Sequence, residues 1–327
     1  MKLKKIIVAT LVFALLLPAT TALAATPVYE YGFDGELGGA VVATREGDVD
    51  GLPVTANVPK ANSSIDAQFG DGVNGQSVFL DGSYGLILDA KAVGPDYSIA
   101  FWINPARFSN FSPIVQIGQD LLETEGRCSW LNITKTDWAG DIAPVIWSRS
   151  QTASLELGDD PGLVWPWYQK AYFAADEANP IALAKEEWNH VVVTVDSTTV
   201  GMDPVLETEV PGTVHSKLYI NGELFGEGPV AKYTFENDSK IYLGINAWDI
   251  ILKGYFDDFK VYDVALTDAE VKDAMNTPAA TVASTSTSTS TNAPKTGVAS
   301  LGLVFGLGAI AFGTGAVVLK KKGKEEE

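Results

Sequence analysis

Residues 25–276 of this chain are predicted to fold as an all-β domain of two packed antiparallel sheets, and three observations predict it. Apolar and polar residues alternate in short runs, as they do in strands with one buried face. Clusters of Gly, Asn, Asp and Pro separate these runs. A helical repeat of apolar residues is clear only near residue 276. Many short strands with turns between them are typical of a two-sheet sandwich.

Six runs carry the clearest strand pattern, and they are residues 77–80, 97–103, 188–196, 217–225, 239–244 and 254–262. Within the fourth run, the dipeptide Asn221-Gly222 separates two alternating segments. A type I′ turn requires positive φ at both central positions, and Asn followed by Gly adopts that geometry most readily. The sequence therefore predicts a β-hairpin centred on this dipeptide.

A short helix is predicted to close the domain at about residues 268–275. Thr267 can cap its N-terminus, and Glu270 stands three residues later, which is the capping-box pattern. Leu266 precedes the cap and can pack against Val271 as a hydrophobic staple.

Five segments share a further pattern, and they read FLDGSY at 79–84, YSIAFWINP at 97–105, WNHVVVTVD at 188–196, KLYINGE at 217–223 and GYFDDFKVYDVALTDAEV at 254–271. In this order they resemble the laminin-G-like domains of the concanavalin A-like lectin and glucanase superfamily. The resemblance covers most of residues 27–276. It implies a jelly-roll sandwich, a fold that is used both to bind glycans or proteins and to cleave glycans.

Catalysis on glycans would require a pair of carboxylates on one face of the domain. The Glu-x-Asp-x-x-Glu strand of related glucanases does not occur here. Glu123 with Glu125, and Glu207 with Glu209, have the spacing of one strand face, but each pair lies in loop-like, Pro- or Gly-flanked sequence. His190 lies inside an apolar strand and is expected to be structural. No catalytic residue is therefore assigned.

One metal site is expected. Simple alternation in the last predicted strand places Asp257 on the face of Phe259, where a carboxylate is costly unless it is paired or bound to a metal. In the laminin-G-like domains that this chain resembles, a structural Ca²⁺ lies near this strand and near an N-terminal Phe-Asp-Gly, which residues 33–35 match. Asp34 and Asp257 are thus the expected Ca²⁺ ligands. The alternative is that Asp257 caps a turn or pairs with a basic residue, and Asp258 is expected to be solvated.

Ligand recognition is expected in residues 118–185, a segment that is longer here than in the family pattern. It holds five of the eight tryptophans, namely Trp130, Trp138, Trp147, Trp165 and Trp167. Aromatic faces stack on the apolar faces of sugar rings. Trp165, Trp167 and Tyr168 are the predicted ligand-binding residues, because Pro166 favours an exposed loop. The alternative is that these rings fill the core of the sandwich.

Charge excludes one class of partner. The chain has 41 acidic and 23 basic residues and a net charge of -18, which repels the phosphates of nucleic acid. Cys128 is the single cysteine, so an exported chain would depend on packing or on a bound metal rather than on an intramolecular disulfide.

The N-terminus has the order of a secretory signal peptide. Lys2, Lys4 and Lys5 precede the apolar run 6–17, and Ala22-Leu23-Ala24 supplies the small residues of a cleavage site. Residues 1–24 are therefore predicted to be removed after Ala24.

The C-terminus has the order of a surface anchor. A Ser/Thr-rich linker at 277–292 is followed by an uncharged stretch long enough to span a bilayer at 298–319 and by a basic tail at 320–327. Between linker and span stand Ala293, Pro294, Lys295, Thr296 and Gly297. This arrangement resembles the sorting signal of sortase-anchored Gram-positive surface proteins, with Ala in place of the usual Leu. The resemblance implies that a sortase cuts after Thr296 and joins it to peptidoglycan. The alternative is a single-pass membrane anchor.

Together these features predict a secreted, wall-anchored, non-catalytic binding module whose ligand is a glycan or a surface protein. Two alternatives stay open, namely a glycoside hydrolase or lyase of the same superfamily and a structural surface protein without a specific ligand.

Overall fold

The computed structural model describes residues 24–46, 58–109, 111–118, 127–136, 140–150, 163–167, 183–203, 207–236 and 238–279. The chain divides into two units, Met1–Ala283 and Ser284–Glu327, and every described residue belongs to the first. The described residues leave out nearly all of the predicted leader and most of the linker. They also leave out the sorting motif at 293–297 and the predicted span. The described part of the chain contains no helix of membrane-spanning length and hydropathy.

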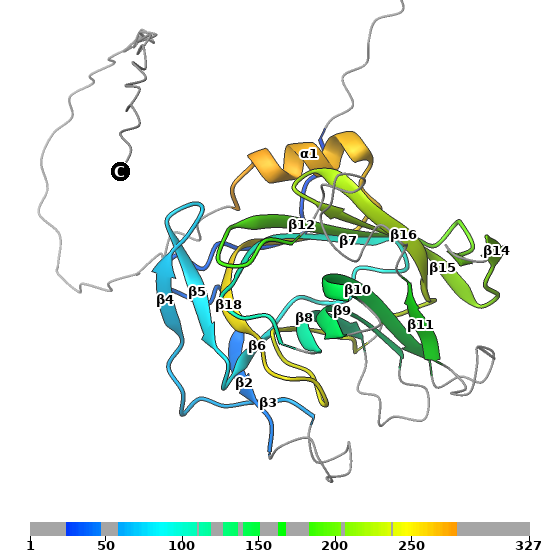
Figure 1. Ribbon diagram of the computed structural model, residues 1–327. Coiled ribbons are helices and arrows are strands. Elements are labelled where there is room, and N and C mark those ends of the chain that lie inside the picture. The colour runs from blue at the N-terminus through cyan, green and yellow to red at the C-terminus, as the bar shows by residue number, and fades with distance from the viewer. Residues whose placement is uncertain are drawn as a thin grey trace, which may run out of the picture. The chain divides into compact units, whose positions relative to one another are not determined.

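Two antiparallel sheets form the domain, as the sequence predicts (Figure 1). The first sheet has the order β16-β15-β12-β7-β18-β5-β4, and β1 also pairs with β18. Its strands are β1 (Tyr29–Tyr31), β4 (Gln68–Asp71), β5 (Gln76–Asp81), β7 (Tyr97–Pro105), β12 (Asn189–Asp196), β15 (Thr213–Ile220), β16 (Glu223–Ala231) and β18 (Lys253–Tyr262).

The second sheet has the order β11-β10-β9-β8-β17-β6-β2-β3. Its strands are β2 (Val41–Thr44), β3 (Lys60–Ala61), β6 (Gly85–Leu88), β8 (Ser112–Gly118), β9 (Arg127–Thr136), β10 (Gly140–Ser150), β11 (Leu163–Trp167) and β17 (Lys240–Leu243). A separate hairpin consists of β13 (Met202–Asp203) and β14 (Thr208–Glu209). This arrangement is consistent with the jelly roll that the resemblance implies.

The hydrophobic core lies between the two sheets and draws on alternate residues of each strand. Val191, Val193 and Val195 of β12 belong to this core, as do Leu131 and Ile133 of β9. Each fully buried side chain of this kind contributes roughly 1.5–3 kcal/mol to the free energy of unfolding. The residues between them on each strand therefore face outward, and their positions define the two outer faces of the sandwich.

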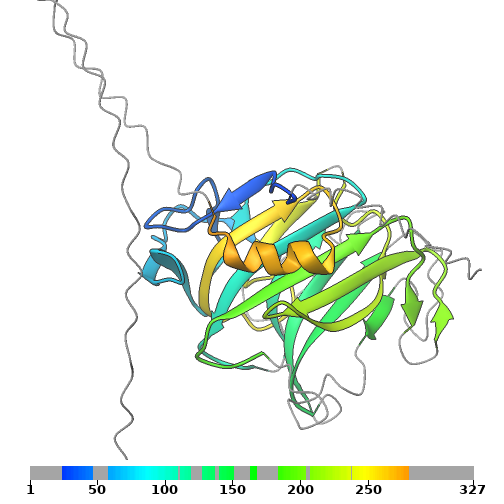
Figure 2. The same cartoon turned by 90° about the horizontal axis from the view of Figure 1, so that it is seen from above.

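One helix, α1 (Asp268–Asn276), covers the outer face of the first sheet (Figure 2). The capping box is confirmed, because Thr267 accepts from the backbone N–H of Glu270 while the Glu270 carboxylate accepts from Thr267. Leu266 and Val271 lie in one buried cluster beneath the helix, which fits the predicted staple.

The predicted hairpin is also confirmed. β15 and β16 pair up to Ile220 opposite Glu223, which leaves Asn221 and Gly222 as a two-residue turn. Both residues have positive φ, 51° and 80°, as a type I′ turn requires.

The last strand differs from the prediction by one residue. A β-bulge lies between Asp257 and Lys260, and Asp258 within it has φ 47°. Phe256 and Phe259 therefore both face the core, and Asp257 lies on the opposite face. The prediction that Asp257 and Phe259 lie on the same face of the strand is therefore wrong. Asp258 is also buried, at 4% exposure, rather than solvated, and Lys260 is 2% exposed.

Candidate ligand-binding face

Three tryptophans gather on the outer face of the second sheet. Trp130 of β9 and Trp147 of β10 are directly paired across the strands, and their rings stack with centroids 6.0 Å apart and planes 4° apart. Trp248, in the connection from β17 to β18, meets the Trp130 ring edge-on at 5.1 Å. These three rings are called the aromatic cluster below. Alternation along β9 points Trp130 outward, because Leu131 faces the core.

The same row continues across two further strands. Gln116 of β8 pairs with Trp130 on one side and with Tyr242 of β17 on the other. The order across the sheet is therefore Trp147, Trp130, Gln116 and Tyr242, one residue from each of four neighbouring strands. Side chains in such a row share one face, so an amide lies between aromatic rings.

A polar network fixes the loop that carries Trp248. Asn246 Oδ1 accepts from the backbone N–H groups of Trp248, at 3.1 Å, and Asp249, at 2.7 Å. Asp249 Oδ2 accepts from Asn246 Nδ2 at 2.6 Å and from Asn132 Nδ2 of β9 at 3.0 Å. Arg45 Nη1 donates to the Asn246 carbonyl oxygen at 2.8 Å. The loop is thus tied both to itself and to the sheet.

Asp249 is a buried carboxyl group with an altered pKa. Burial raises its pKa to about 6, against the lowering effect of the donated hydrogen bonds from Asn246 and Asn132 and of the Arg45 charge. The group is therefore charged at neutral pH and largely protonated near pH 5. When charged, it is an acceptor at the edge of the aromatic cluster.

Two further acceptors on this face are buried and unpaired. Gln116 is 5% exposed and Asn132 is 1% exposed. Gln116 Oε1 and Asn132 Oδ1 have no hydrogen-bond partner among the residues that the structure describes. Buried polar atoms normally have a hydrogen-bond partner, since a buried donor or acceptor without one costs about 1–3 kcal/mol of stability. Both atoms flank Trp130, one across the strands and one along β9, and both are suited to accept from a hydroxyl group.

The two predicted metal ligands meet at one turn, away from the aromatic cluster. Asp34 Oδ1 accepts from the backbone N–H of Gln76 at 2.8 Å. Asp257 Oδ2 accepts from the N–H groups of Val73, at 2.6 Å, and Asn74, at 3.1 Å. Both carboxylates therefore hold the β4–β5 turn, and for Asp257 this is the turn-capping role of the alternative prediction.

A Ca²⁺ ion fits this site in part. Burial, with the neighbouring charge of Asp258 adding to it, raises the pKa of Asp257 to about 6, so acidic groups are crowded here. Asn74 Nδ2 donates to Asp258 Oδ2 at 2.5 Å. The described residues hold no group of three or more His, Cys, Asp or Glu side chains that could bind a metal. Asp34 and Asp257 would therefore need backbone carbonyl oxygens and water as further ligands.

Comparison with known proteins identifies the fold family. Residues 81–272 match the family described as Laminin_G_3, concanavalin A-like lectin/glucanases superfamily, which covers more than half of the chain. The chain belongs to this family. No curated protein matches this laminin-G-like chain significantly.

Solved structures resemble the laminin-G-like domain at low sequence identity. Domain 4 of AbnA, a GH43 extracellular arabinanase from Geobacillus stearothermophilus solved with arabinotriose, has 20% identity and a TM-score of 0.50. The match covers 77% of this chain and 99% of that one. The Ruminococcus gnavus IT-sialidase CBM40 bound to α2,3 sialyllactose has 13% identity and a TM-score of 0.36, over 60% of this chain and 95% of that one. The first of these likenesses shows the fold.

The predicted ligand-binding residues fall at the edge of the laminin-G-like domain's second sheet. Trp165 and Trp167 lie in β11, which pairs with β10, so they occupy a strand rather than the predicted loop. Pro166 is tolerated there because an edge strand needs no donor on its open side. The side chains of Trp165 and Trp167, and all of Tyr168, lie outside the described part of the structure.

Of the two acidic pairs that the sequence analysis considered, the structure describes one. Glu207 and Glu209 are exposed and belong to the separate β13–β14 hairpin. Glu123 and Glu125 lie outside the described residues. His190 is buried as expected, and burial, with the Lys260 charge, lowers its pKa to about 3.

The residues that sequence reasoning missed are the polar ones of this face, namely Gln116, Asn132, Asn246 and Asp249, together with Trp248. The segment Asn246-Ala247-Trp248-Asp249 carries one usable signal, because Asn commonly accepts from backbone N–H groups two residues ahead. Asn132 of β9, which donates to Asp249, carries no such signal in its neighbouring residues.

Proposed function

We propose that this protein is a carbohydrate-binding module that is exported and held at the cell surface, and that its saccharide site is the aromatic cluster with Gln116, Asn132 and Asp249. The observation that carries the proposal is that two buried acceptors beside Trp130, Gln116 Oε1 and Asn132 Oδ1, have no hydrogen-bond partner among the described residues. An aromatic ring offers a platform for the apolar face of a sugar, and flanking acceptors receive its hydroxyl groups.

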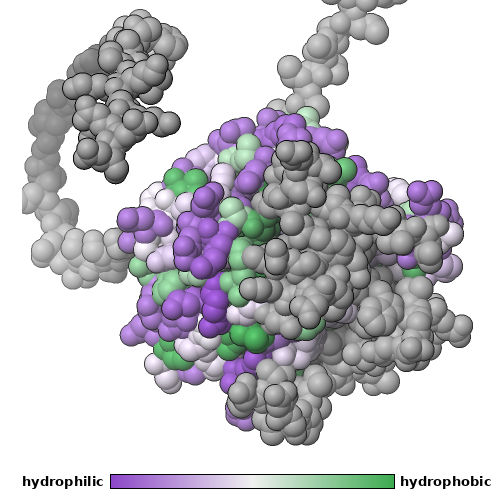
Figure 3. All heavy atoms as spheres, in the orientation of Figure 1, coloured by the Kyte–Doolittle hydropathy of each residue, from purple (hydrophilic) through white to green (hydrophobic). Residues whose placement is uncertain are grey.

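The fold family and the likeness to the AbnA domain support a saccharide ligand. The AbnA domain of the same fold was solved with arabinotriose, which makes a short arabino-oligosaccharide the first probe for this chain. A flat apolar protein-docking surface has less support. On the face seen in Figure 3, described hydrophobic residues are interspersed with hydrophilic ones, and the exposed large hydrophobics come from separate elements.

The proposal extends to location and to a metal. Removal of residues 1–24 and sortase cleavage after Thr296 would leave the domain on a Ser/Thr-rich linker attached to peptidoglycan. Ca²⁺ bound by Asp34 and Asp257 would hold the β4–β5 turn against β18 and would be structural, since this turn lies apart from the aromatic cluster.

Calorimetric titration of the domain, residues 25–283, with arabino-, xylo-, cello- and galacto-oligosaccharides tests the proposed site. We expect saturable binding to at least one series, with at least a tenfold loss of affinity in Asn132→Ala. Asn62→Ala is the matched control, because Asn62 donates one side-chain hydrogen bond to Thr44, at 3.1 Å, on β2 of the same sheet. That variant should bind normally. Binding that Asn132→Ala leaves intact would contradict the site, and release of reducing sugar would identify a hydrolase instead.

A further inference from the structure

A cavity of about 350 Å³ is lined by residues of the N-terminal segment and of helix α1. Its lining includes residues 24–27 and helix residues, together with Glu30, Lys260 and Tyr262. The proposed function makes no use of this cavity. Its lining includes Ala24 and Ala25, the two residues that flank the predicted leader cleavage site.

Ala25 is docked onto the domain. It packs against the buried cluster beneath α1, which contains Leu266 and Val271. Ala25 and Glu270 both line the cavity, and the Ala25 backbone N–H is one of the groups that lower the pKa of Glu270. Three residues later, the Val28 N–H donates to the Val261 carbonyl oxygen at 2.7 Å. The chain is therefore held against the first sheet from its first residue after the cleavage site.

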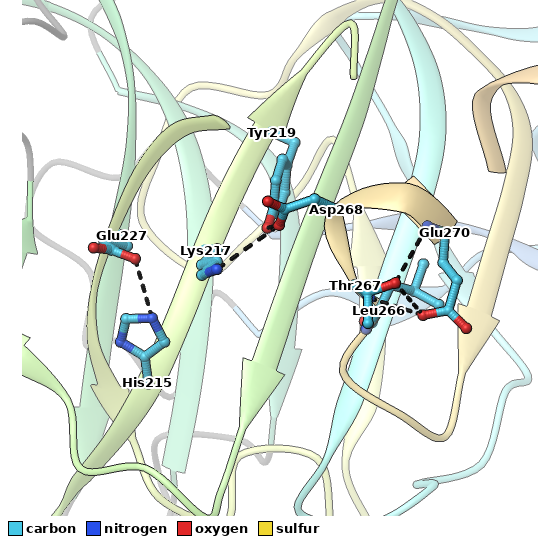
Figure 4. Close-up of polar contacts among 9 residues, drawn as sticks. His215, Lys217, Tyr219, Glu227, Leu266, Thr267, Asp268 and Glu270 are labelled. Atoms are coloured by element: carbon cyan, nitrogen blue, oxygen red, sulfur yellow. Dashed lines mark hydrogen bonds and ion pairs between the residues drawn. The ribbon is translucent and has the colours of Figure 1, made fainter. Parts of the chain in front are cut away.

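The Glu270 carboxylate is fixed in place by the capping box. Its Oε2 accepts from the Thr267 backbone N–H at 2.9 Å and from Thr267 Oγ1 at 2.7 Å (Figure 4). These bonds lower the pKa of Glu270, so the group is ionised at neutral pH. An ionised carboxylate with a restricted geometry is a good partner for a cation, because little side-chain entropy is left to lose.

Carboxylates outnumber cations in the cavity lining. Glu30, Glu270 and Asp273 line it, together with one ammonium group, that of Lys260. Lys260 Nζ donates to the carbonyl oxygens of Ala274, at 3.4 Å, and Thr277, so it already holds the C-terminal end of α1. The cavity therefore favours one more positive charge on the side of residues 24–27.

We propose that leader cleavage supplies this charge, and that the α-ammonium group of Ala25 forms an ion pair with Glu270 that fastens α1 and the N-terminal segment together. Hydrolysis of the Ala24–Ala25 peptide bond adds one water, leaves a carboxylate on Ala24 and frees an amine on Ala25. That amine has an ordinary pKa near 8 and is positively charged at neutral pH. The inference rests on the export part of the proposed function and not on saccharide binding.

A thermodynamic cycle tests the ion pair. The domain is prepared to end at Ala283 in two forms, one that starts at Ala25 with a free amine and one with Gly-Ser before Ala25, which keeps an amide there. Urea unfolding is measured for each form with and without Glu270→Gln. We expect Glu270→Gln to raise the unfolding equilibrium constant in both forms, because a neutral amide is a weaker acceptor in the capping box, with an additional severalfold increase only in the form with the free amine.

Glu223→Gln is the matched control, because Glu223 pairs with Lys272 of the same helix at 3.0 Å, outside the cavity lining. Its effect should be equal in the two forms. The α-amine should also titrate above its ordinary pKa in the free form and return toward it in Glu270→Gln. Equal effects of Glu270→Gln in the two forms would overturn the ion pair. A surface-extracted protein whose first residue is not Ala25 would overturn its origin in leader cleavage, and neither result depends on saccharide binding.

Discussion

Asn132 on β9 donates a hydrogen bond of 3.0 Å to Asp249, a residue 117 positions later in the chain. The bond joins the strand that carries Trp130 to the loop that carries Trp248. It uses the amide nitrogen of Asn132 and leaves Oδ1 as a buried acceptor on the same face. The proposed site is therefore arranged before any ligand arrives, which lowers the entropic cost of binding.

Trp248→Ala is predicted to weaken saccharide binding by tenfold or more, because a partly exposed ring that packs edge-on against Trp130 has the character of a binding hot spot. Calorimetric titration measures the loss. Trp188→Ala is the matched control, since Trp188 lies by Tyr255 of the first sheet, with ring centroids 6.3 Å apart. Equal binding by the two variants would speak against a role for Trp248.

Gln116→Met is predicted to change stability and binding in opposite directions. Methionine has nearly the shape of glutamine but lacks the unpaired acceptor, so the free energy of unfolding should rise by up to about 1 kcal/mol without ligand. Affinity for the saccharide should fall, because that acceptor is the proposed partner of a sugar hydroxyl. Urea unfolding and calorimetry measure the two effects. A variant that loses stability and binds normally would show Gln116 to be a structural residue only.

Asp249→Asn is predicted to flatten part of the pH dependence of stability. The pKa of Asp249 is about 6 in the folded protein, above its unfolded value of 3.8. Its contribution to stability is therefore fully present below pH 3.8 and is lost as the pH rises through 6. The difference in unfolding free energy between wild type and variant should change by up to about 3 kcal/mol between pH 4 and pH 7.5.

Asp257 and His190 also contribute to the pH dependence of stability in this range, so the comparison must be a difference between wild type and variant at each pH. The pKa of Asp257 is raised to about 6, so its contribution to stability also falls as the pH rises. The pKa of His190 is lowered to about 3, so its contribution to stability increases as the pH rises. A wild-type minus Asp249→Asn difference that stays constant with pH would contradict the raised pKa of Asp249.

Calcium is predicted to raise the melting temperature of the wild-type domain, because a ligand that binds only the folded state stabilises it. Thermal unfolding in CaCl₂ and in EGTA measures this shift. Asp34→Asn and Asp257→Asn should reduce the shift, whereas Glu209→Gln, in the exposed β13–β14 hairpin, should keep it. Identical melting of the wild-type domain in CaCl₂ and EGTA would rule out the metal.

The local features of the fold were predictable because their causes lie within a few residues of sequence. Asn221-Gly222 specifies its own turn, and Thr267 with Glu270 specifies the start of α1. The bulge at Asp258 has no such cause. β5 pairs with the first part of β18 and β1 with the last part, and the bulge lies where one neighbour gives way to the other.

The candidate site was predictable only at Trp130 and Trp147. Trp130 and Trp147 lie in the tryptophan-rich segment that sequence reasoning singled out, although that reasoning placed the ligand at Trp165, Trp167 and Tyr168. Gln116, Asn132 and Asp249 could not be found in this way, because strand pairing and a long-range hydrogen bond bring them together.

Nuclear magnetic resonance of the isotope-labelled domain during titration with the tightest-binding oligosaccharide tests the proposed site most directly. The side-chain amide signals of Gln116 and Asn132 and the indole signal of Trp130 should show the largest shifts, and those of Asn62 and Trp188 should stay unchanged. Saturable binding that leaves Gln116, Asn132 and Trp130 unshifted, with changes confined to other parts of the domain, would contradict the account.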